Sequence, residues 1–291
     1  MKSIPLFRDT WFYPAIFAGW CMVMLTVHGE YQFSGVPLPS FSEGGNPLAG
    51  FQEQEAIQGT ITELEKGLSG SLPVSEQGQI VHNIGSAFYD MYRCSQRHDF
   101  LDSAFGYYSK SISLVGSIPR FYYNLGRAYM ESENFIQART YYEKTLALDP
   151  NHMMALHNLG LMDFYQFKDD SSAERLLSHE MRIGGQLPTC YYILGEIALD
   201  RGDAARALEL FQKEVTIYTQ KAGSEASPAD AGTRRFAAAN ACLKLALLYS
   251  TKFRDQRQAE NNLNGYMQLE QDDVKKQQAL NELGRYWNVH R

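Results

Sequence analysis

The side chains best suited to bind a metal or to act as nucleophiles are three of the four cysteines and two histidines. Cys94, Cys190 and Cys242 lie far apart, and no Cys-x-x-Cys, haem-attachment or His-Glu-x-x-His spacing occurs. Cys190 starts a predicted helix, where the pKa of a thiol can be lowered, but a small buried apolar residue is the simpler interpretation. His82 and His157 have no carboxylate or cysteine at usable spacing. We therefore expect no metal site and no cofactor.

Patterns for enzymatic chemistry are missing from the sequence as well. It contains neither a phosphate-binding glycine loop nor a Gly-x-Ser-x-Gly elbow. The 27 basic residues face 33 acidic ones, whereas a nucleic-acid binder needs a surplus of Lys and Arg. With 291 residues, 44% of them hydrophobic, the chain can bury a core and is not disordered as a whole. We expect a non-enzymatic protein that binds no nucleic acid.

A stretch near the amino terminus is apolar enough to cross a membrane. Residues 10–27 include no charged side chain, and their number falls within the roughly 17–25 residues of a transmembrane helix. We predict such a helix over residues 10–28. The aromatic and aliphatic side chains expected to anchor it are Trp11, Ile16, Phe17, Trp20, Val23 and Leu25.

The charges around this stretch predict its orientation. Lys2 and Arg8 precede it, and no basic residue follows until Lys66. The positive-inside rule then makes residues 1–9 a short cytoplasmic tail and places the rest of the chain outside the cytoplasm, in the periplasm if the source is bacterial. A cleaved signal peptide has the same charge order and would leave a soluble protein starting near Glu30. A buried helix of a soluble protein is a third alternative.

A linker is expected between the membrane helix and the folded domain. Residues 29–52 are rich in Gly, Pro and Ser and lack periodicity, which is typical of a tether. Several of its side chains are apolar and would dock on the next domain or contact a neighbouring membrane protein. These are Phe33, Leu38, Phe41, Leu48 and Phe51. Residues 53–291 are predicted to form the folded domain.

The predicted domain carries an internal repeat. Two related stretches start at Pro119 and Pro188, 69 residues apart, and read PRFYYNLG and PTCYYILG; a third starts between them at Met153. Within residues 119–152, large side chains and a glycine recur at spacings of three and one, which puts them on one helical face. A turn and a second helix follow. The key positions are Tyr122, Leu125, Gly126, Tyr129, Ala138, Tyr142 and Pro150.

This unit resembles a tetratricopeptide repeat, because it matches that family's pattern of large residue, Leu, Gly, aromatic, Ala, aromatic and Pro. The resemblance implies an all-α fold, a right-handed α-solenoid of about five helical hairpins with capping helices, preceded by the one transmembrane helix. The other units centre on Gly85, Gly160, Gly195 and Ala246. About seven extra residues in the first unit, two helical turns, predict longer helices there. The fourth unit should be followed by a loop over residues 222–232.

In such repeats the first helices line a concave surface, so the resemblance implies a partner-binding groove. Arg120, Tyr123 and Arg127 recur at i, i+3 and i+7, and Arg and aromatic residues are favoured at protein interfaces. The groove is completed by His157, Leu161, Phe164, Tyr192 and Glu196. A second interpretation is that the two arginines pair internally, with Asp90, Glu131 or Glu196 as partners.

One known variety of this groove is not expected. A subset of the family, the chaperone adaptors, grips a terminal carboxylate with Lys, Asn and Arg side chains. Here only Asn124 fits that set, because the matching positions hold His82, Ser86, Asn124, Met154 and Asn158.

Together these features predict a membrane-anchored, extracytoplasmic scaffold that binds other proteins, as an accessory subunit or assembly factor of a membrane complex. The alternatives are a soluble periplasmic adaptor released by signal cleavage, and a cofactor-binding or enzymatic subunit. Binding through the linker or the convex face is the alternative to binding in the groove.

Overall fold

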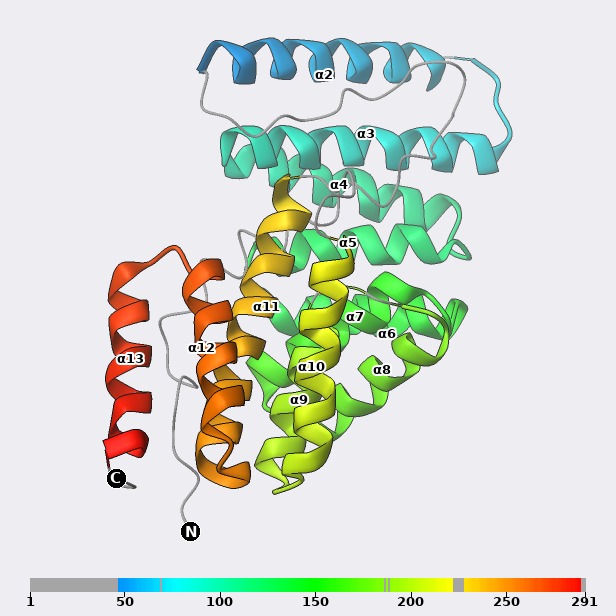
Figure 1. The fold of residues 1–291 in the computed structure, drawn as a ribbon. Helices are drawn as coiled ribbons and strands as arrows, with labels where there is room; N and C mark the ends of the chain where they lie inside the picture. The colour runs from blue at the N-terminus through cyan, green and yellow to red at the C-terminus, as the bar shows by residue number, and fades with distance from the viewer. Residues whose placement is uncertain (1–46, 69, 186, 188, 222–227, 289–291) are drawn as a thin grey trace. The chain divides into compact units, whose positions relative to one another are not determined.

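The computed structural model describes residues 47–288, except 69, 186, 188 and 222–227. Every regular element in these ranges is a helix (Figure 1), as the all-α expectation required. The predicted cytoplasmic tail, the membrane helix over 10–28 and the linker up to residue 46 lie outside the described residues. None of the described helices has both the length and the apolar character needed to cross a bilayer.

The described residues form two compact units, residues 47–185 and 187–288. The amino-terminal unit contains α2 (Pro47–Leu68), α3 (Val74–Ser95), α4 (His98–Leu114), α5 (Pro119–Glu131), α6 (Phe135–Leu148), α7 (Met153–Met162), a π-helical turn (Asp163–Phe167) and α8 (Asp170–Arg182). The carboxy-terminal unit contains α9 (Cys190–Asp200), α10 (Ala204–Lys221), α11 (Pro228–Leu248), a π-helical turn (Tyr249–Phe253), α12 (Gln256–Leu269) and α13 (Asp273–Asn288).

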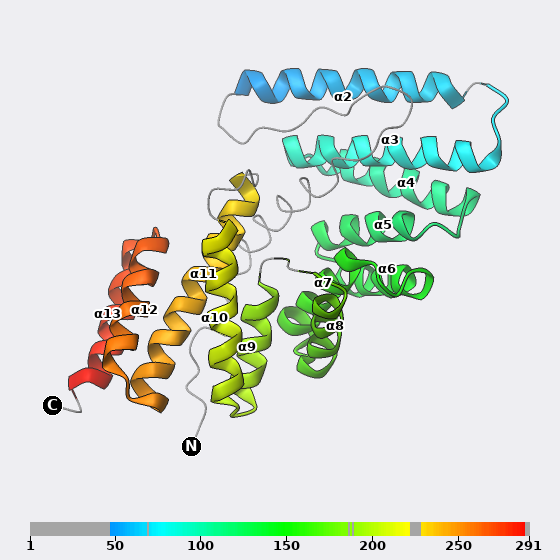
Figure 2. The same ribbon diagram turned by 45° about the vertical axis from the view of Figure 1, so that its right-hand side comes forward.

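Consecutive helices pack as hairpins, and the five predicted hairpins are confirmed. They are α3–α4, α5–α6 and α7–α8 in the first unit, and α9–α10 and α11–α12 in the second. α2 covers the side of α3 that faces away from α5 (Figures 1 and 2), and it buries Ile57 and Ile61 there. α3 has 22 residues and α4 has 17, against 13 and 14 in α5 and α6. The prediction of longer helices in the first hairpin is therefore confirmed.

Small residues let the two helices of four hairpins approach closely. A Cβ atom added to Gly126 would lie 2.9 Å from Cδ1 and Cε1 of Tyr142, and Ala138, one turn before Tyr142, is completely buried. The same close approach recurs in three other hairpins. The pairs are Gly85–Tyr108, Gly160–Leu177 and Gly195–Phe211. The repeat positions inferred from the sequence therefore have a common packing role.

Side-chain caps start the second helices of four hairpins, including α10, where Oδ1 of Asp203 accepts from the backbone N–H of Arg206 at 3.0 Å. Asn134 accepts a hydrogen bond from the backbone N–H of Gln137, and Asp169 and Asp255 do the same at α8 and α12, which satisfies a donor that the helix leaves unpaired. The third hairpin carries one extra residue in its turn. There the backbone forms the π-helical turn Asp163–Phe167, and Lys168, with φ 54°, follows it as the cap.

Two boundaries differ from the sequence-based expectation. α2 begins at Pro47, inside the stretch predicted as linker. α11 begins at Pro228, so residues 228–232 are helical instead of part of the predicted loop. Proline suits the first position of a helix, because its missing N–H has no acceptor there and its φ is already helical.

Candidate functional site

The first helices of the first two hairpins, α3 and α5, contact each other along a polar row. Nη2 of Arg120 donates to Oε1 of Gln79 at 2.5 Å. Farther along, Nδ2 of Asn124 lies 3.1 Å from Nε2 of His82. Still farther along, Arg127 and Glu131 on α5 meet Tyr89 on α3. We call this the α3–α5 face, comprising Gln79, His82, Tyr89, Asp90, Arg93, Arg120, Asn124, Arg127 and Glu131.

Arg127 is held in place by aromatic rings. Its guanidinium carbon lies 4.9 Å from the ring centroid of Tyr89 and 5.9 Å from that of Tyr123, within the range of cation–π attraction. Nη2 of Arg127 is also 3.5 Å from the Tyr89 hydroxyl, which donates to Oε1 of Glu131 at 2.9 Å. The guanidinium of Arg127, a half-buried residue, is therefore held by contacts within the folded chain.

Asp90 lies among positive charges on the same face. Burial raises the pKa of its carboxyl to about 6, and the opposing effect of the Arg93 and Arg127 guanidinium groups is smaller. Both arginines must therefore lie near this carboxylate. The internal pairing expected between Arg127 and Asp90 is consistent with this arrangement.

His82 is an internal residue with a structural role. It is 1% exposed, and burial, followed by the charge of Arg120, lowers its pKa to about 3. Because the neutral ring faces the Asn124 amide through Nε2, that nitrogen is the acceptor and the proton is assigned to Nδ1. The ring also meets Phe121 edge-on, with centroids 4.4 Å apart.

Four of the residues predicted to line the groove lie within the packed helices. Tyr123, His157, Leu161 and Phe164 are each at most 7% exposed. Nδ1 of His157 is 2.8 Å from Oε2 of the fully buried Glu180, on the second helix of the same hairpin. These side chains stabilise the helix packing, whereas Arg120 and Arg127 remain half-buried. A role in partner binding stays a prediction for all of them.

The other two predicted groove residues belong to the carboxy-terminal unit. Oε2 of Glu196 on α9 forms an ion pair with Nζ of Lys244 on α11 at 2.8 Å. Tyr192 is half-buried, and its backbone N–H donates to Oε2 of Glu214 at 3.3 Å. Glu196 was one of the three acidic residues considered as partners for Arg120 and Arg127, and it is paired with Lys244.

The described cysteines and possible metal ligands are not arranged as a reactive site. Cys94, Cys190 and Cys242 are free thiols, and the latter two are buried. Burial raises the pKa of Cys242 to about 11, and Cys190 is fully enclosed, as a small apolar residue would be. Across the ranges that the structure describes, no three His, Cys, Asp or Glu side chains gather as metal ligands would.

Gln79, Tyr89 and Arg93 were not identified from the sequence as site residues. A signal for Gln79 was present, because it lies six residues before Gly85, as Arg120 lies six before Gly126. Arg93 lies eight residues after Gly85, beyond the length of an ordinary first helix, and the longer α3 brings it onto the face.

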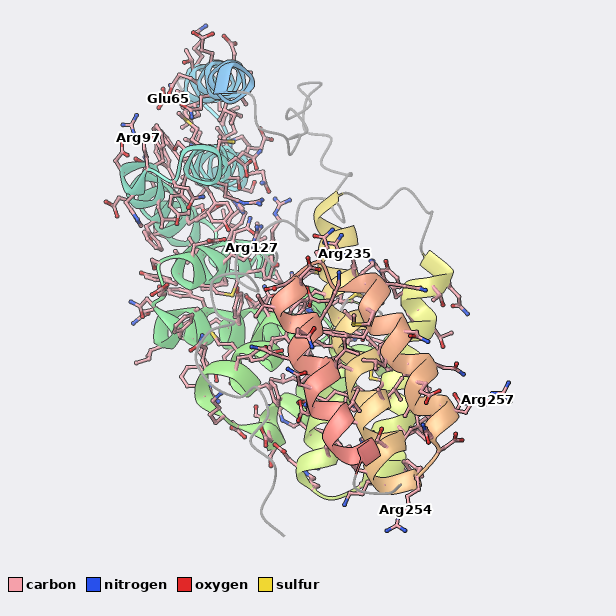
Figure 3. The ribbon with its side chains drawn as sticks, turned by 60° about the vertical axis from the view of Figure 1, so that its left-hand side comes forward. Glu65, Arg97, Arg127, Arg235, Arg254 and Arg257 are labelled. Carbon is pink, nitrogen blue, oxygen red and sulfur yellow. The ribbon has the colours of Figure 1, made fainter. Side chains whose placement is uncertain are left out.

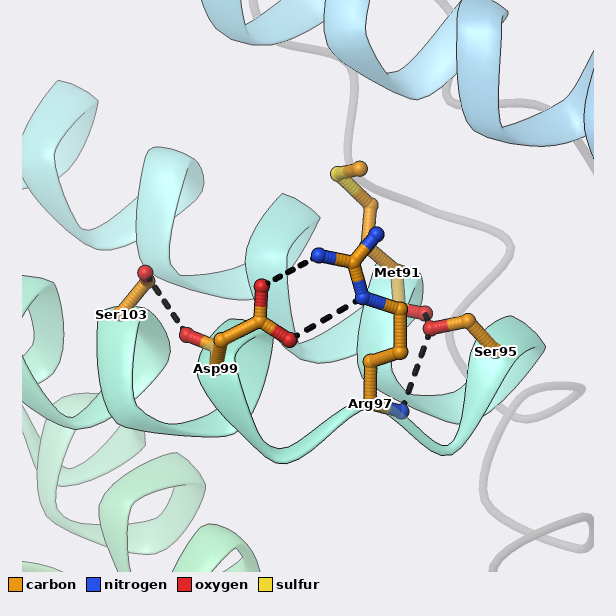
Figure 4. A network of polar contacts seen from close by, with 5 residues as sticks. All are labelled: Met91, Ser95, Arg97, Asp99 and Ser103. Atoms are coloured by element: carbon orange, nitrogen blue, oxygen red, sulfur yellow. Dashed lines mark hydrogen bonds and ion pairs between the residues drawn. The ribbon is translucent and has the colours of Figure 1, made fainter.

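An exposed arginine of the same unit provides a contrast. Arg97, at the turn between α3 and α4, binds both oxygens of Asp99 at 3.2 and 2.7 Å (Figure 4). Both side chains are more than half exposed. Figure 3 shows Arg97 and Arg127 on opposite sides of the unit.

Comparison with known proteins identifies the repeat. Residues 119–152 match the family model described as tetratricopeptide repeat. A comparison with curated protein sequences finds no match.

Solved structures show where the fold has been seen before. MamA is 21% identical, with a TM-score of 0.51, over 69% of this chain and 95% of that one. BtubC from P. vanneervenii is 14% identical, with a TM-score of 0.58, over 76% and 91%. YrrB, described as a TPR protein with an unusual peptide-binding site, is 17% identical, with a TM-score of 0.51, over 78% and 98%. At these identities the likeness is one of fold alone.

Proposed function

Because the chain contains a tetratricopeptide repeat within a fold of helical hairpins, we propose that it is a scaffold that binds another protein through the α3–α5 face. The observation that carries this proposal is the half-buried Arg127, fixed between the rings of Tyr89 and Tyr123. Arg and aromatic side chains are enriched at the centres of interfaces. A side chain that is already ordered loses little further entropy when a partner binds.

The fold relationship supports the same proposal. YrrB, which shares the fold, is described as having a peptide-binding site. The nine residues of the α3–α5 face do not include a Ser, Thr or Cys nucleophile paired with a general base. We also propose that the role of the chain is non-enzymatic.

Membrane attachment is a further part of the proposal and rests on the sequence of residues 10–28. We propose that this stretch anchors the chain with its amino terminus in the cytoplasm. The helical units would then serve a membrane complex, as an accessory subunit or assembly factor. Extraction of membranes at alkaline pH should leave the full-length protein in the pellet. A soluble product whose amino-terminal sequence starts near Glu30 would overturn the anchor.

Site-specific photo-crosslinking tests the binding surface. A photoreactive phenylalanine analogue is placed in the full-length chain either at Gln79, half-buried on the α3–α5 face, or at Gln137, exposed on α6. After irradiation in cells and extraction in mild detergent, mass spectrometry identifies the products. We expect a defined crosslinked partner from position 79 and none from position 137. Equal crosslinking at both positions, or at neither, would contradict binding through this face.

A further inference from the structure

We propose that the α3–α5 face selects an acidic segment of its partner protein, and that Arg93 and Arg127 receive the Asp or Glu carboxylates beside Asp90. This inference rests on the proposed function and names the chemistry that the face would recognise. Three observations carry it: an unused donor, an excess of positive charge, and the position of Asp90.

The unused donor belongs to Arg93. Its Nη1 is buried and donates to no acceptor among the described residues. A buried charged donor without an acceptor is costly, so a ligand that brings an oxygen acceptor to this position gains free energy, and an anionic acceptor gains more than a neutral one. A carboxylate is the protein group that matches a guanidinium best.

Charge on the face favours an anion as well. Arg93, Arg120 and Arg127 outnumber Asp90 and Glu131, although the chain as a whole carries a net charge of −6. Arg127 is already fixed by the rings of Tyr89 and Tyr123. Glu131 accepts from the Tyr89 hydroxyl, so part of its charge is already compensated.

Asp90 makes the expected binding depend on pH. Against the larger effect of burial, the charges of Arg93, on its own helix, and of Arg127, on α5, lower the pKa of Asp90. The charge of Asp90 in turn adds to the rise that burial causes in the pKa of Tyr108 on α4. The pKa of Asp90 is already raised to about 6 by burial, and a second carboxylate nearby would raise it further. Binding should therefore take up a proton, after which the Asp90 carboxyl can donate a hydrogen bond to the ligand.

The residues that carry this inference differ from those of the chaperone-adaptor clamp. The clamp positions in this chain include His82 and Asn158, which are buried and bonded within the helix packing. Arg93 and Arg127 occupy other positions on α3 and α5. Of these two arginines, Arg93 lies on the lengthened α3.

Fluorescence anisotropy on the full-length protein in detergent tests the proposal. The probe is a labelled octapeptide of alternating Asp and Ser, compared with matched Asn/Ser and Lys/Ser peptides at pH 7.5 and 5.5. We expect the acidic peptide to bind at least about tenfold more tightly than the other two, and R93Q to remove about tenfold of that affinity. The acidic peptide should bind more tightly at pH 5.5 than at pH 7.5. D90N should bind the acidic peptide at pH 7.5 with the affinity that the unaltered protein has at pH 5.5. The affinity of D90N should not change between the two pH values.

The matched control is R97Q, which removes one arginine from the opposite side of the unit and should leave the affinity unchanged. R93K serves as the second variant, because it keeps the charge, loses Nη1 and should bind with intermediate affinity. Equal binding of the Asp/Ser and Asn/Ser peptides overturns the proposal, as does an equal loss in R93Q and R97Q. If position 79 still crosslinks to a partner while the acidic peptide fails to bind, this inference fails and the proposed function stands.

Discussion

The side-chain amide of Asn158 lies 3.4 Å from the hydroxyl of Tyr123 and thereby joins the third hairpin to the second. It also lies 3.3 Å from the hydroxyl of Tyr142, on the other helix of the second hairpin. Asn124 holds the same repeat position one unit earlier and meets His82 of the first hairpin. In both cases the asparagine lies two residues before the glycine of its own repeat. Its partner lies three residues before the glycine of the preceding repeat. The contact is therefore a recurrent way in which adjacent hairpins dock.

Replacing Asn158 with Ala should destabilise the amino-terminal unit. The Asn158 side chain is completely buried, and its removal takes away a hydrogen bond to each of two tyrosine hydroxyls, so we expect a loss of about 1–3 kcal/mol in the free energy of unfolding. Urea unfolding followed by circular dichroism measures it. Asn83 is the matched control, because it holds the same repeat position but is half-buried and bonds to Gln79 on its own helix. Equal losses in the two variants would show that the docking contact contributes nothing.

Gly126→Ala should also destabilise the protein, although alanine is the better helix former. The new Cβ would lie 2.9 Å from the ring of Tyr142, and overpacking of this kind costs about 1–3 kcal/mol. Gly106→Ala is the control on α4, because nothing lies within 4 Å of the added Cβ. It should raise stability by up to about 1 kcal/mol. Thermal unfolding that moves in the same direction for both variants would contradict this explanation.

The close approach of Gly126 and Tyr142 could be predicted from the sequence because it depends on local spacing. In four units a glycine is followed on the next helix by an alanine and, four residues after the alanine, by a large apolar residue. Helical periodicity places these residues on facing surfaces. The start of α11 at Pro228 also had a local signal, since proline favours the first helical position. Its surroundings, rich in Gly, Ser and Ala, suggested a loop instead.

The burial of two predicted groove residues could not be predicted in the same way. Tyr123 and His157 hold positions that face inward in the repeat pattern, and the expectation was that they line an open surface. The structure buries them, because the Tyr123 ring packs 4.8 Å from that of His152 and His157 turns to Glu180, 23 residues away. Both contacts depend on how side chains pack in three dimensions, which the spacing of the repeat residues does not specify.

Removal of the buried His157–Glu180 contact should destabilise the amino-terminal unit. The Glu180 side chain is fully buried, its Oε2 lies 2.8 Å from Nδ1 of His157, and removing one partner of such a buried hydrogen bond costs about 1.5–3 kcal/mol. Glu180→Ala should lose that amount, while Glu180→Gln, which keeps an acceptor, should lose less. Glu143→Ala is the surface control, since the Glu143 side chain is more than half exposed in its ion pair with Arg139, and such a pair is worth less than about 1 kcal/mol. A chemical denaturation midpoint unchanged by Glu180→Ala would refute the assignment.

The pH dependence of stability should show two opposing contributions from α3. The pKa of His82 is lowered to about 3 by burial, so below pH 6.5 the unfolded chain takes up a proton that the folded chain does not. Stability then falls with falling pH by at most about 1.4 kcal/mol per unit. The pKa of Asp90 is raised to about 6, so between pH 6 and 3.8 the folded chain holds the extra proton. Its contribution rises with falling pH at a similar rate.

The two contributions should therefore nearly cancel between pH 6 and 4, and D90N should expose the His82 contribution. We expect the free energy of unfolding of D90N, measured in urea at pH 7, 6, 5 and 4, to decrease below pH 6 more steeply than that of the unaltered protein. The difference should approach about 1.4 kcal/mol per pH unit. D99N is the control, because Asp99 is an exposed carboxylate at the neighbouring turn whose pKa is lowered by Arg97. Parallel curves for D90N and the unaltered protein over this range would show that Asp90 does not hold its proton in the folded state.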